Sequence, residues 1–149
     1  MASSELPTSL HQSGRLENRV HSRGGEPEVR FYWRARPTLL PVWLNGTLQV
    51  VRWGNRCRTE KKLPPTGWTW QATVESGRWS ALEPEPVTIP ASFALAGGVW
   101  FKVTVGVKGL VVRNRGGALV VYVVCEPATR YFRVMTRSEF MPVLVGELI

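Results

Sequence analysis

Residues 39–53, LLPVWLNGTLQVVRW, are the stretch that decides the fold. Two apolar runs, residues 39–44 and 47–53, flank the dipeptide Asn45-Gly46. Asn-Gly between apolar runs is the strongest short hairpin signal, because both residues tolerate the positive φ angles that a tight type I′ turn requires. The stretch therefore predicts two strands joined by a two-residue turn.

Short apolar runs of strand length continue on both sides of this hairpin. Glycine and proline separate them, and the Gly-Gly of residues 116–117 predicts a second hairpin between the last two. Many short strands with frequent turns are typical of a β-sandwich or a barrel. We expect strands at 29–33, 68–74, 87–93, 99–105, 110–114 and 118–125, and short helical turns within 75–83 and at 136–140.

Residues 1–28 have a different composition. They are rich in Ser, Gly, Glu and Arg and hold almost no large apolar residue after Leu16. Such a segment cannot bury enough apolar surface to offset its ordering entropy, so we interpret it as a flexible extension ahead of one domain at 29–149. The first residues lack the pattern of a secretory signal, and no apolar run approaches the roughly 20 residues of a membrane-spanning helix. We therefore expect a cytoplasmic protein.

The positive charge is concentrated in one part of the chain. The net charge is +8, and residues 1–28 carry three arginines against four glutamates, which leaves +9 for the rest. Such a concentration can contact phosphates, or it can be a solvated face that aids solubility. Aromatic residues interleaved with the bases favour nucleic acid. Between residues 30 and 62 the only acid is Glu60, and the eight bases are Arg30, Arg34, Arg36, Arg52, Arg56, Arg58, Lys61 and Lys62.

Trp53 is the best candidate for an exposed, base-stacking tryptophan among the seven in the chain. It ends a predicted strand, within the sequence Arg-Trp-Gly-Asn-Arg of residues 52–56. Aromatic faces stack on unpaired bases, while neighbouring guanidinium groups hold phosphates. The alternative is a core tryptophan that anchors the strand end. The candidate nucleic-acid-binding residues of this region are Arg34, Arg36, Arg52, Trp53, Asn55, Arg56 and Arg58.

A second group of candidates follows the predicted strand at residues 68–74. Gln71, Thr73 and Glu75 alternate along it and would share one face, and Arg78 could fold back toward that face. This polar stripe is either a binding floor or the solvent side of a half-buried strand. Gln71, Thr73 and Arg78 are therefore added to the nucleic-acid-binding candidates.

The residue types exclude several kinds of active site. The chain has no aspartate, and both histidines, His11 and His21, precede the predicted domain, so a Ser-His-Asp triad is excluded. A zinc site needs four N or S ligands, which the domain does not supply. Cys57 and Cys125 are interpreted as reduced thiols rather than as a disulfide. We expect no metal ion and no cofactor.

Several short motifs occur in one order along the chain. They are Arg36-Pro37-Thr38, Pro41-Val42, Arg52-Trp53-Gly54, Gln71-Ala72-Thr73-Val74-Glu75-Ser76, Ile89-Pro90-Ala91-Ser92-Phe93, Cys125-Glu126-Pro127-Ala128 and Met141-Pro142-Val143. This order, colinear from about Arg36 to Val145, resembles the SOS response-associated peptidase (SRAP) family. The family has a twisted, mainly β, barrel-like α+β domain, so the resemblance implies a single antiparallel barrel-like body with few short helices.

The resemblance also implies a function in DNA binding. Members of the family grip single-stranded DNA and link covalently to abasic sites. The link forms through a cysteine directly after the initiator Met, with the assistance of an Asn, a Glu and a His.

This chain departs from the family at each of those positions. Ala2 stands at the cysteine, Gln71 at the Asn, and Ser138 or Glu139 at the His, while the Glu is lost around residues 94–96. The two internal cysteines have no α-amine with which to close the ring of the family's linkage. The resemblance therefore implies a DNA-binding scaffold without the crosslinking chemistry. Thr73 stands where the family has an Arg, which weakens one phosphate contact.

Three hypotheses follow from the sequence. The first is a catalytically silent SRAP-like domain that binds single-stranded or damaged DNA without a covalent bond. The second is a protein-interaction module on the same fold, in the setting of a phage or mobile element. The third is an enzyme with a relocated active site built on Glu75, Glu126 or Cys57. General acid–base catalysis needs a pair of titratable groups, and no two of these residues have a spacing that suggests such a pair.

Overall fold

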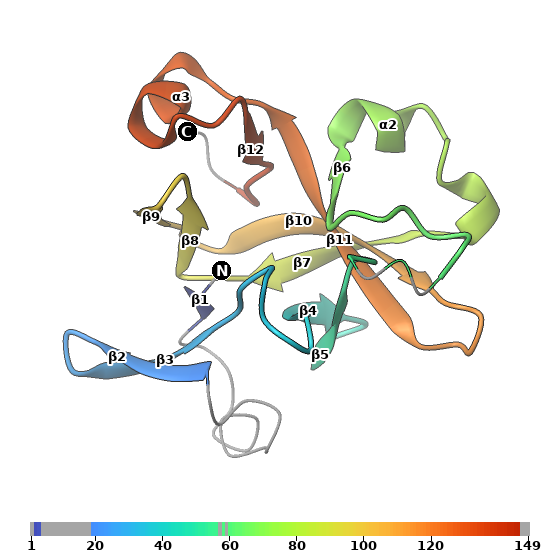
Figure 1. The fold of residues 1–149 in the computed structure, drawn as a ribbon, viewed down its shortest axis with the longest axis horizontal. Coiled ribbons are helices and arrows are strands. Elements are labelled where there is room, and N and C mark those ends of the chain that lie inside the picture. The colour runs from blue at the N-terminus through green and yellow to red at the C-terminus, as the bar shows by residue number, and fades with distance from the viewer. Residues whose placement is uncertain (1, 4–18, 57, 59, 147–149) are drawn as a thin grey trace.

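The computed structural model describes residues 2–3, 19–56, 58 and 60–146 (Figure 1). It is a mainly β structure that contains a five-stranded barrel and two short α-helices, which confirms the predicted fold class. The strands of the barrel, in spatial order, are β10 (Gly106–Arg113), β7 (Glu85–Pro90), β4 (Leu39–Leu44), β5 (Thr47–Trp53) and β11 (Leu119–Pro127). Pairing between β10 and β11 closes the barrel.

The barrel is mixed, whereas the sequence predicted antiparallel pairing throughout. Four of its pairings are antiparallel, but β5 and β11 run parallel, with Arg52 opposite Val120 and Trp53 opposite Val121. The next strand, β6 (Trp68–Trp70), pairs in parallel with the following part of β11. β6 therefore continues the line of β5 along one edge of β11, after the excursion of residues 54–67.

The other edge of β11 is used in the same way. β10 pairs with its first half, and β12 (Phe140–Pro142) pairs antiparallel with Cys125–Pro127 at its far end. The two α-helices, α2 (Gln71–Glu75) and α3 (Arg130–Thr136), and the 3₁₀ turn η2 (Ser80–Leu82) join these strands (Figure 1). Among the described residues, no helix is long and apolar enough to cross a membrane.

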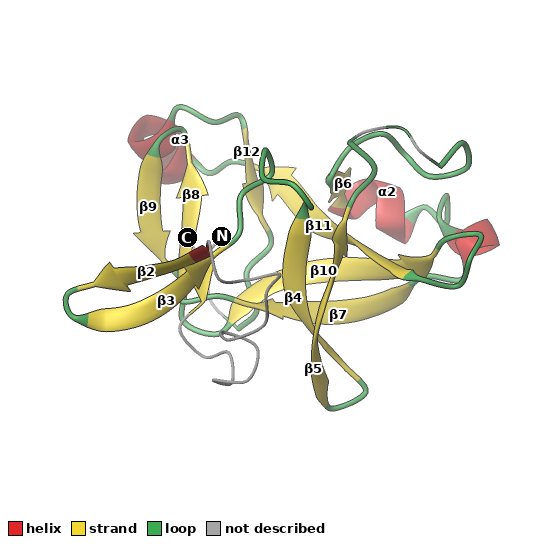
Figure 2. Ribbon diagram, turned by 60° about the horizontal axis from the view of Figure 1, so that its bottom comes forward, coloured by secondary structure: helices red, strands yellow, loops and turns green. Residues whose placement is uncertain are grey.

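A second, smaller sheet lies beside the barrel (Figure 2). Its strands, in spatial order, are β2 (Val20–Arg23), β3 (Glu26–Arg30), β1 (Ala2–Ser3), β8 (Phe93–Ala96) and β9 (Val99–Lys102). The prediction of a flexible extension is wrong for residues 20–28, which form most of the β2–β3 hairpin. Gly24 and Gly25, with φ angles of 58° and 86°, supply its tight turn. Residues 2–3 of the predicted extension form β1, and Arg19 is buried, whereas residues 1 and 4–18 lie outside the described residues.

The predicted elements agree with the structure where the residues of the turn itself determine the local fold. The strands at 39–44 and 47–53 form as predicted, with positive φ angles at Asn45 and Gly46. The predicted strand at 68–74 is wrong beyond Trp70, because the chain turns there into α2. The predicted helical turn at 136–140 is also wrong, because the helix is α3, which ends at Thr136.

One buried glutamate holds the two hairpins of the second sheet together. The side chain of Glu28 is 3% exposed, and its two oxygens accept hydrogen bonds from Arg23 at 2.9 Å and from Arg30 at 2.8 Å. Arg23 in turn lies 4.2 Å from the ring centre of Phe93 on β8, and Arg30 lies 5.5 Å from that of Trp100 on β9. The three charged groups therefore fasten the β2–β3 hairpin to β8 and β9.

These contacts set the ionisation of Glu28. Burial by itself disfavours the charged carboxylate, but the hydrogen bonds and charges of Arg23 and Arg30 outweigh burial and lower the pKa of Glu28 below its usual value. A carboxylate with a lowered pKa in the folded state stabilises the protein above its unfolded pKa, and this contribution disappears as pH falls through the folded pKa.

We predict that Glu28→Gln lowers the free energy of unfolding by about 1.5–3 kcal/mol at pH 7, because it removes charged hydrogen bonds from a buried site. Urea unfolding at pH 7 and below about pH 4 measures the effect. The difference from the native protein should shrink as the pH falls through the lowered pKa of Glu28 in the folded state. Glu26→Gln, at an exposed position of the same strand, is the matched control, and a difference that stays constant with pH contradicts this role of the carboxylate.

Candidate functional site

Three tryptophans pack against one another where β5, β6 and the segment after β3 meet. The ring centres of Trp33, Trp53 and Trp68 lie 4.9–5.3 Å apart in edge-to-face arrangements. Two glycines make this packing possible. A Cβ at Gly67 would lie 2.5 Å from the ring of Trp33, and a Cβ at Gly54 would collide with the carbonyl oxygen of Thr66.

The prediction that Trp53 exposes its ring is wrong. Only 4% of Trp53 is accessible, and its Nε1 donates a hydrogen bond to the carbonyl oxygen of Gly67 at 2.9 Å. Successive side chains on a strand point to opposite faces. Trp53 therefore shares the inner face of β5 with Val51, which is also buried, and Arg52 between them lies on the outer face. That alternation is visible in the sequence and is the signal that favours the core alternative.

Asn55 is a structural residue rather than a surface contact. It is fully buried, and its Nδ2 donates hydrogen bonds to the carbonyl oxygens of Glu60 at 2.7 Å and Leu63 at 3.0 Å. Its Oδ1 accepts a hydrogen bond from Arg52 at 2.7 Å, and Arg52 also lies 3.8 Å from the carboxylate of Glu60. The predicted contacts Asn55 and Arg52 therefore shape the loop of residues 54–67, which we call the basic loop.

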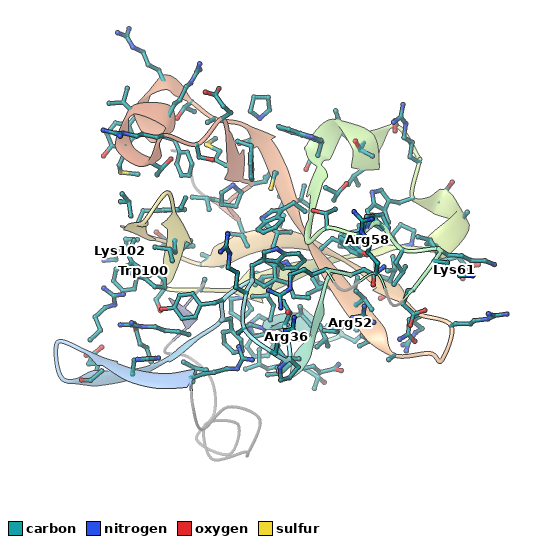
Figure 3. The ribbon with its side chains drawn as sticks, in the orientation of Figure 1. Arg36, Arg52, Arg58, Lys61, Trp100 and Lys102 are labelled. Carbon is teal, nitrogen blue, oxygen red and sulfur yellow. The ribbon has the colours of Figure 1, made fainter. Side chains whose placement is uncertain are left out.

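Of the remaining arginines and lysines of this region, all but Arg56 are exposed. Arg56 is half-buried, and its guanidinium carbon lies 5.9 Å from the ring centre of Trp33. Figure 3 shows Arg36, Arg52, Arg58 and Lys61 in the central and right-hand part of the view, while Trp100 and Lys102 lie to the left on β9. Cys57 lies outside the described residues. The exposed bases between residues 34 and 62 are Arg34, Arg36, Arg58, Lys61 and Lys62.

The exposed aromatic residues of the site were not predicted from the sequence. Trp70 is 47% exposed and Phe140 is 40% exposed, and their ring centres lie 6.1 Å apart. Phe140 also lies 6.4 Å from Trp68. We call Trp70 and Phe140 the exposed ring pair. Because Trp68 contacts Trp33, a continuous line of neighbouring rings joins the exposed ring pair to Arg56 in the basic loop.

The outward position of Trp70 follows from the residue before it. Thr69 is buried, and its Oγ1 accepts a hydrogen bond from Nε1 of the buried Trp79 at 2.9 Å. Alternation along β6 then places Trp68 and Trp70 together on the opposite face. Phe140, some 70 residues later in the chain, reaches the same place because β12 and β6 both pair with β11 at Cys125.

Two clefts lie beside these rings. The first, of about 190 Å³, is lined by Trp68, Phe101 and Phe140 together with residues 94–97 of β8 and its turn, of which all but Leu95 are small. The second, of about 360 Å³, is lined by Thr66, Thr69, Trp70 and three residues that also line the first cleft, Trp68, Cys125 and Phe140. None of the described residues that line either cleft carries a charged side chain.

Cys125 lies at both clefts and is a poor nucleophile. It is a free thiol, 2% exposed. Burial, with a smaller contribution from the neighbouring Glu126, raises the pKa of the Cys125 thiol to about 12. The thiolate is the reactive form, so the thiol stays protonated and unreactive near neutral pH.

The second group of predicted site residues lies elsewhere. The expected polar stripe on one strand face is wrong, because Gln71 and Thr73 belong to α2. Gln71 donates a hydrogen bond to Glu75 at 3.1 Å, one helical turn away, and Arg78 is exposed beyond the helix. Gln71 lines neither of the two clefts. It lines a separate hollow of about 460 Å³ together with Trp43 and Lys108.

Some of the positions that the sequence resemblance singles out lie at the first cleft. Ala94 and Ala96, in the segment where the resemblance implies a lost Glu, line it, and so does Ser138, one of the two residues expected at the His position. Glu139, the other, and Gln71, expected at the Asn position, are not among its lining residues. Ala2 in β1 is the backbone partner of Phe93, the residue before Ala94. Among the described residues, no cluster of His, Cys or Glu could hold a metal ion.

Comparison with protein-family models finds no match, and neither do comparisons with curated proteins and with solved structures. The function is therefore inferred from the residues of the site and their geometry.

We predict that Trp53→Ala lowers the free energy of unfolding by about 3–5 kcal/mol, because it empties the centre of the tryptophan cluster. The matched control, Trp70→Ala, removes the same side chain from an exposed position and should change stability by only about 0.5 kcal/mol. Denaturant unfolding followed by circular dichroism measures both values. Equal losses in the two variants would contradict the assignment of Trp53 to the core.

Proposed function

We propose that this chain is a non-catalytic, SRAP-like domain that binds single-stranded DNA without a covalent bond. The exposed arginines and lysines hold the phosphates, and the exposed ring pair stacks on unpaired nucleobases. The observation that carries the proposal is the continuous line of rings from Trp70 through Phe140, Trp68 and Trp33 to Arg56. It joins a stacking surface to the basic loop, the combination that single-strand binding needs.

The charge distribution supports a polyanionic ligand. Exposed arginines and lysines that neutralise phosphates release condensed counterions, and this release supplies much of the affinity for nucleic acid. Arg58, Lys61 and Lys62 share the basic loop, whose course is fixed by the buried side chain of Asn55. These three basic side chains are thus held on an ordered backbone next to the rings rather than on an unstructured tail.

The ring pair favours single strands over duplexes. An exposed ring can stack only on a base whose face is free, and in a duplex both faces of an internal base are covered by its neighbours. Each base that stacks on an aromatic side chain contributes about 1–3 kcal/mol. A duplex would therefore contact only the exposed arginines and lysines. A single strand would contact these residues and the aromatic rings together.

The SRAP-like part of the proposal is supported by the order of the motifs, by the barrel-like body and by the meeting of Ala94, Ala96 and Ser138 at one cleft. The absence of crosslinking is supported by the side chains that stand there. Neither alanine nor serine can replace the family's Glu and His, and the only thiol in the described lining of the cleft, that of Cys125, is buried and protonated.

We predict that the protein binds single-stranded DNA with an affinity that falls steeply between about 50 and 200 mM salt. The double variant Arg36→Ala, Arg58→Ala should flatten the slope of log K against log salt by about 0.7 for each phosphate that is no longer neutralised. Fluorescence anisotropy with a labelled oligonucleotide measures the slope. Arg115→Ala, an exposed arginine in the β10–β11 turn, is the control. An affinity that does not change with salt would refute the proposed phosphate contacts.

We further predict that Trp70→Ala weakens single-strand binding by about 1–3 kcal/mol and leaves the salt slope unchanged, because it removes stacking but no charge. Trp43→Ala is the matched control, since Trp43 is 43% exposed on β4 and is not part of the line of rings. The same titrations give both numbers. If Trp43→Ala and Trp70→Ala have the same effect, the stacking surface is misplaced.

We predict that incubation with DNA that contains an aldehydic abasic site gives no product that survives a denaturing gel. Residue 2 is alanine, where the resemblance implies a cysteine, so the thiol of the family's chemistry is missing there. The same mixture should show a shifted band on a native gel, which controls for binding. A covalent band on the denaturing gel would show that crosslinking chemistry is retained.

A further inference from the structure

The first cleft is an opening with fixed walls. The β8–β9 turn that forms one wall has Gly97 at a φ angle of 55°, and a Cβ there would collide with the carbonyl oxygen of Thr136 at the end of α3. Phe101 on β9 is braced from behind by Phe132 of α3, with ring centres 5.2 Å apart. The turn and α3 are thus packed closely against each other, which supports this wall of the cleft from behind.

The rim of the cleft at β12 is also held in place. The hydroxyl of Ser138 donates a hydrogen bond to the carbonyl oxygen of Phe140 at 2.7 Å. Phe140 thereby keeps its ring between the first cleft and the second, where it contacts Trp68 on one side and Trp70 on the other. A ligand in the first cleft would touch the same ring that forms half of the exposed ring pair.

The lining determines what kind of ligand fits. The rings of Trp68, Phe101 and Phe140 offer flat apolar surfaces, and the small side chains of Ala94 and Ala96 leave space beside them. The described lining has no charged side chain, and the pKa of Cys125 keeps its thiol neutral. Burying a phosphate here would leave its charge unpaired, which is costly, whereas a flat neutral ring fits.

We infer that the first cleft receives one nucleobase of the bound single strand, turned out of line with its neighbours. This inference rests on the proposed function and adds to it a pocket for a single base. The strand would lie with its phosphates toward the basic loop and with neighbouring bases on Trp70 and Phe140. One base would then pass Phe140 into the first cleft, where it stacks on rings and is shielded from water.

The test compares two single strands of equal length and equal charge. One consists of thymidines, and the other consists of tetrahydrofuran abasic residues, which have the same phosphates and no aldehyde. Both should bind with a similar dependence on salt, and the thymidine strand should bind about 5- to 140-fold more tightly for each base that stacks. If neither strand binds at about 50 mM salt, the proposed function itself fails.

A cleft-filling variant separates the cleft from the exposed ring pair. Ala96→Leu places a larger side chain in the first cleft and should weaken binding of the thymidine strand about 5- to 140-fold, with no effect on the abasic strand. The loss should persist in a Trp70→Ala background, because the two positions contact different bases. Ala118→Leu, an exposed alanine in the β10–β11 turn, is the matched control for stability and binding.

A second measurement needs no variant and therefore does not depend on how Ala96→Leu folds. A strand of abasic residues that carries a single 2-aminopurine has only one base to offer. Its fluorescence should become several-fold less accessible to acrylamide on binding. If the base stays as accessible as in the free strand while salt-dependent binding persists, the base pocket is refuted and the phosphate contacts of the proposed function stand.

Discussion

The edge-to-face packing of Trp33, Trp53 and Trp68 is the interaction on which the rest of the structure depends. Trp53 ends β5 and Trp68 begins β6, the two strands that follow one another along the same edge of β11. Their contact, worth about 0.5–1.5 kcal/mol per aromatic pair beyond simple burial, fixes where the chain leaves that edge and where it returns. Gly54 and Gly67 stand at these two points, because the rings and the Thr66 carbonyl leave no space for a side chain.

The sequence predicts what local chemistry decides and misses what distant pairing decides. The hairpin around Asn45-Gly46 was predictable because the turn needs only its own two residues. The charged region was predictable because exposed arginines follow from composition. The start of α3 could also have been found, since Thr129 accepts a hydrogen bond from the backbone N–H of Phe132 as a helix cap. The parallel pairing of β5 with β11 could not, because its partners are far apart in the chain.

The site itself shows the same division. Trp53 looked exposed because arginines surround it in the sequence, yet its side chain alternates with that of Arg52 and points inward. The rings that are exposed, Trp70 and Phe140, belong to two strands that meet only through β11. Their position depends on register, since Cys125 is opposite Trp70 on one edge and opposite Pro142 on the other. A slip of one residue in β6 would turn Trp70 inward and expose Thr69.

The structure therefore separates charge from apolar surface, and this separation has a consequence for recognition. The exposed arginines and lysines between residues 34 and 62 lie on loops outside the barrel strands, whereas the described lining of both clefts is uncharged. Phosphate contacts do not distinguish one sequence, or a duplex from a single strand, as strongly as base contacts do. Under the proposed function, the basic loop would bring any nucleic acid to the surface. The rings of Trp68, Trp70 and Phe140 would then retain only a strand whose bases are free to leave their stack.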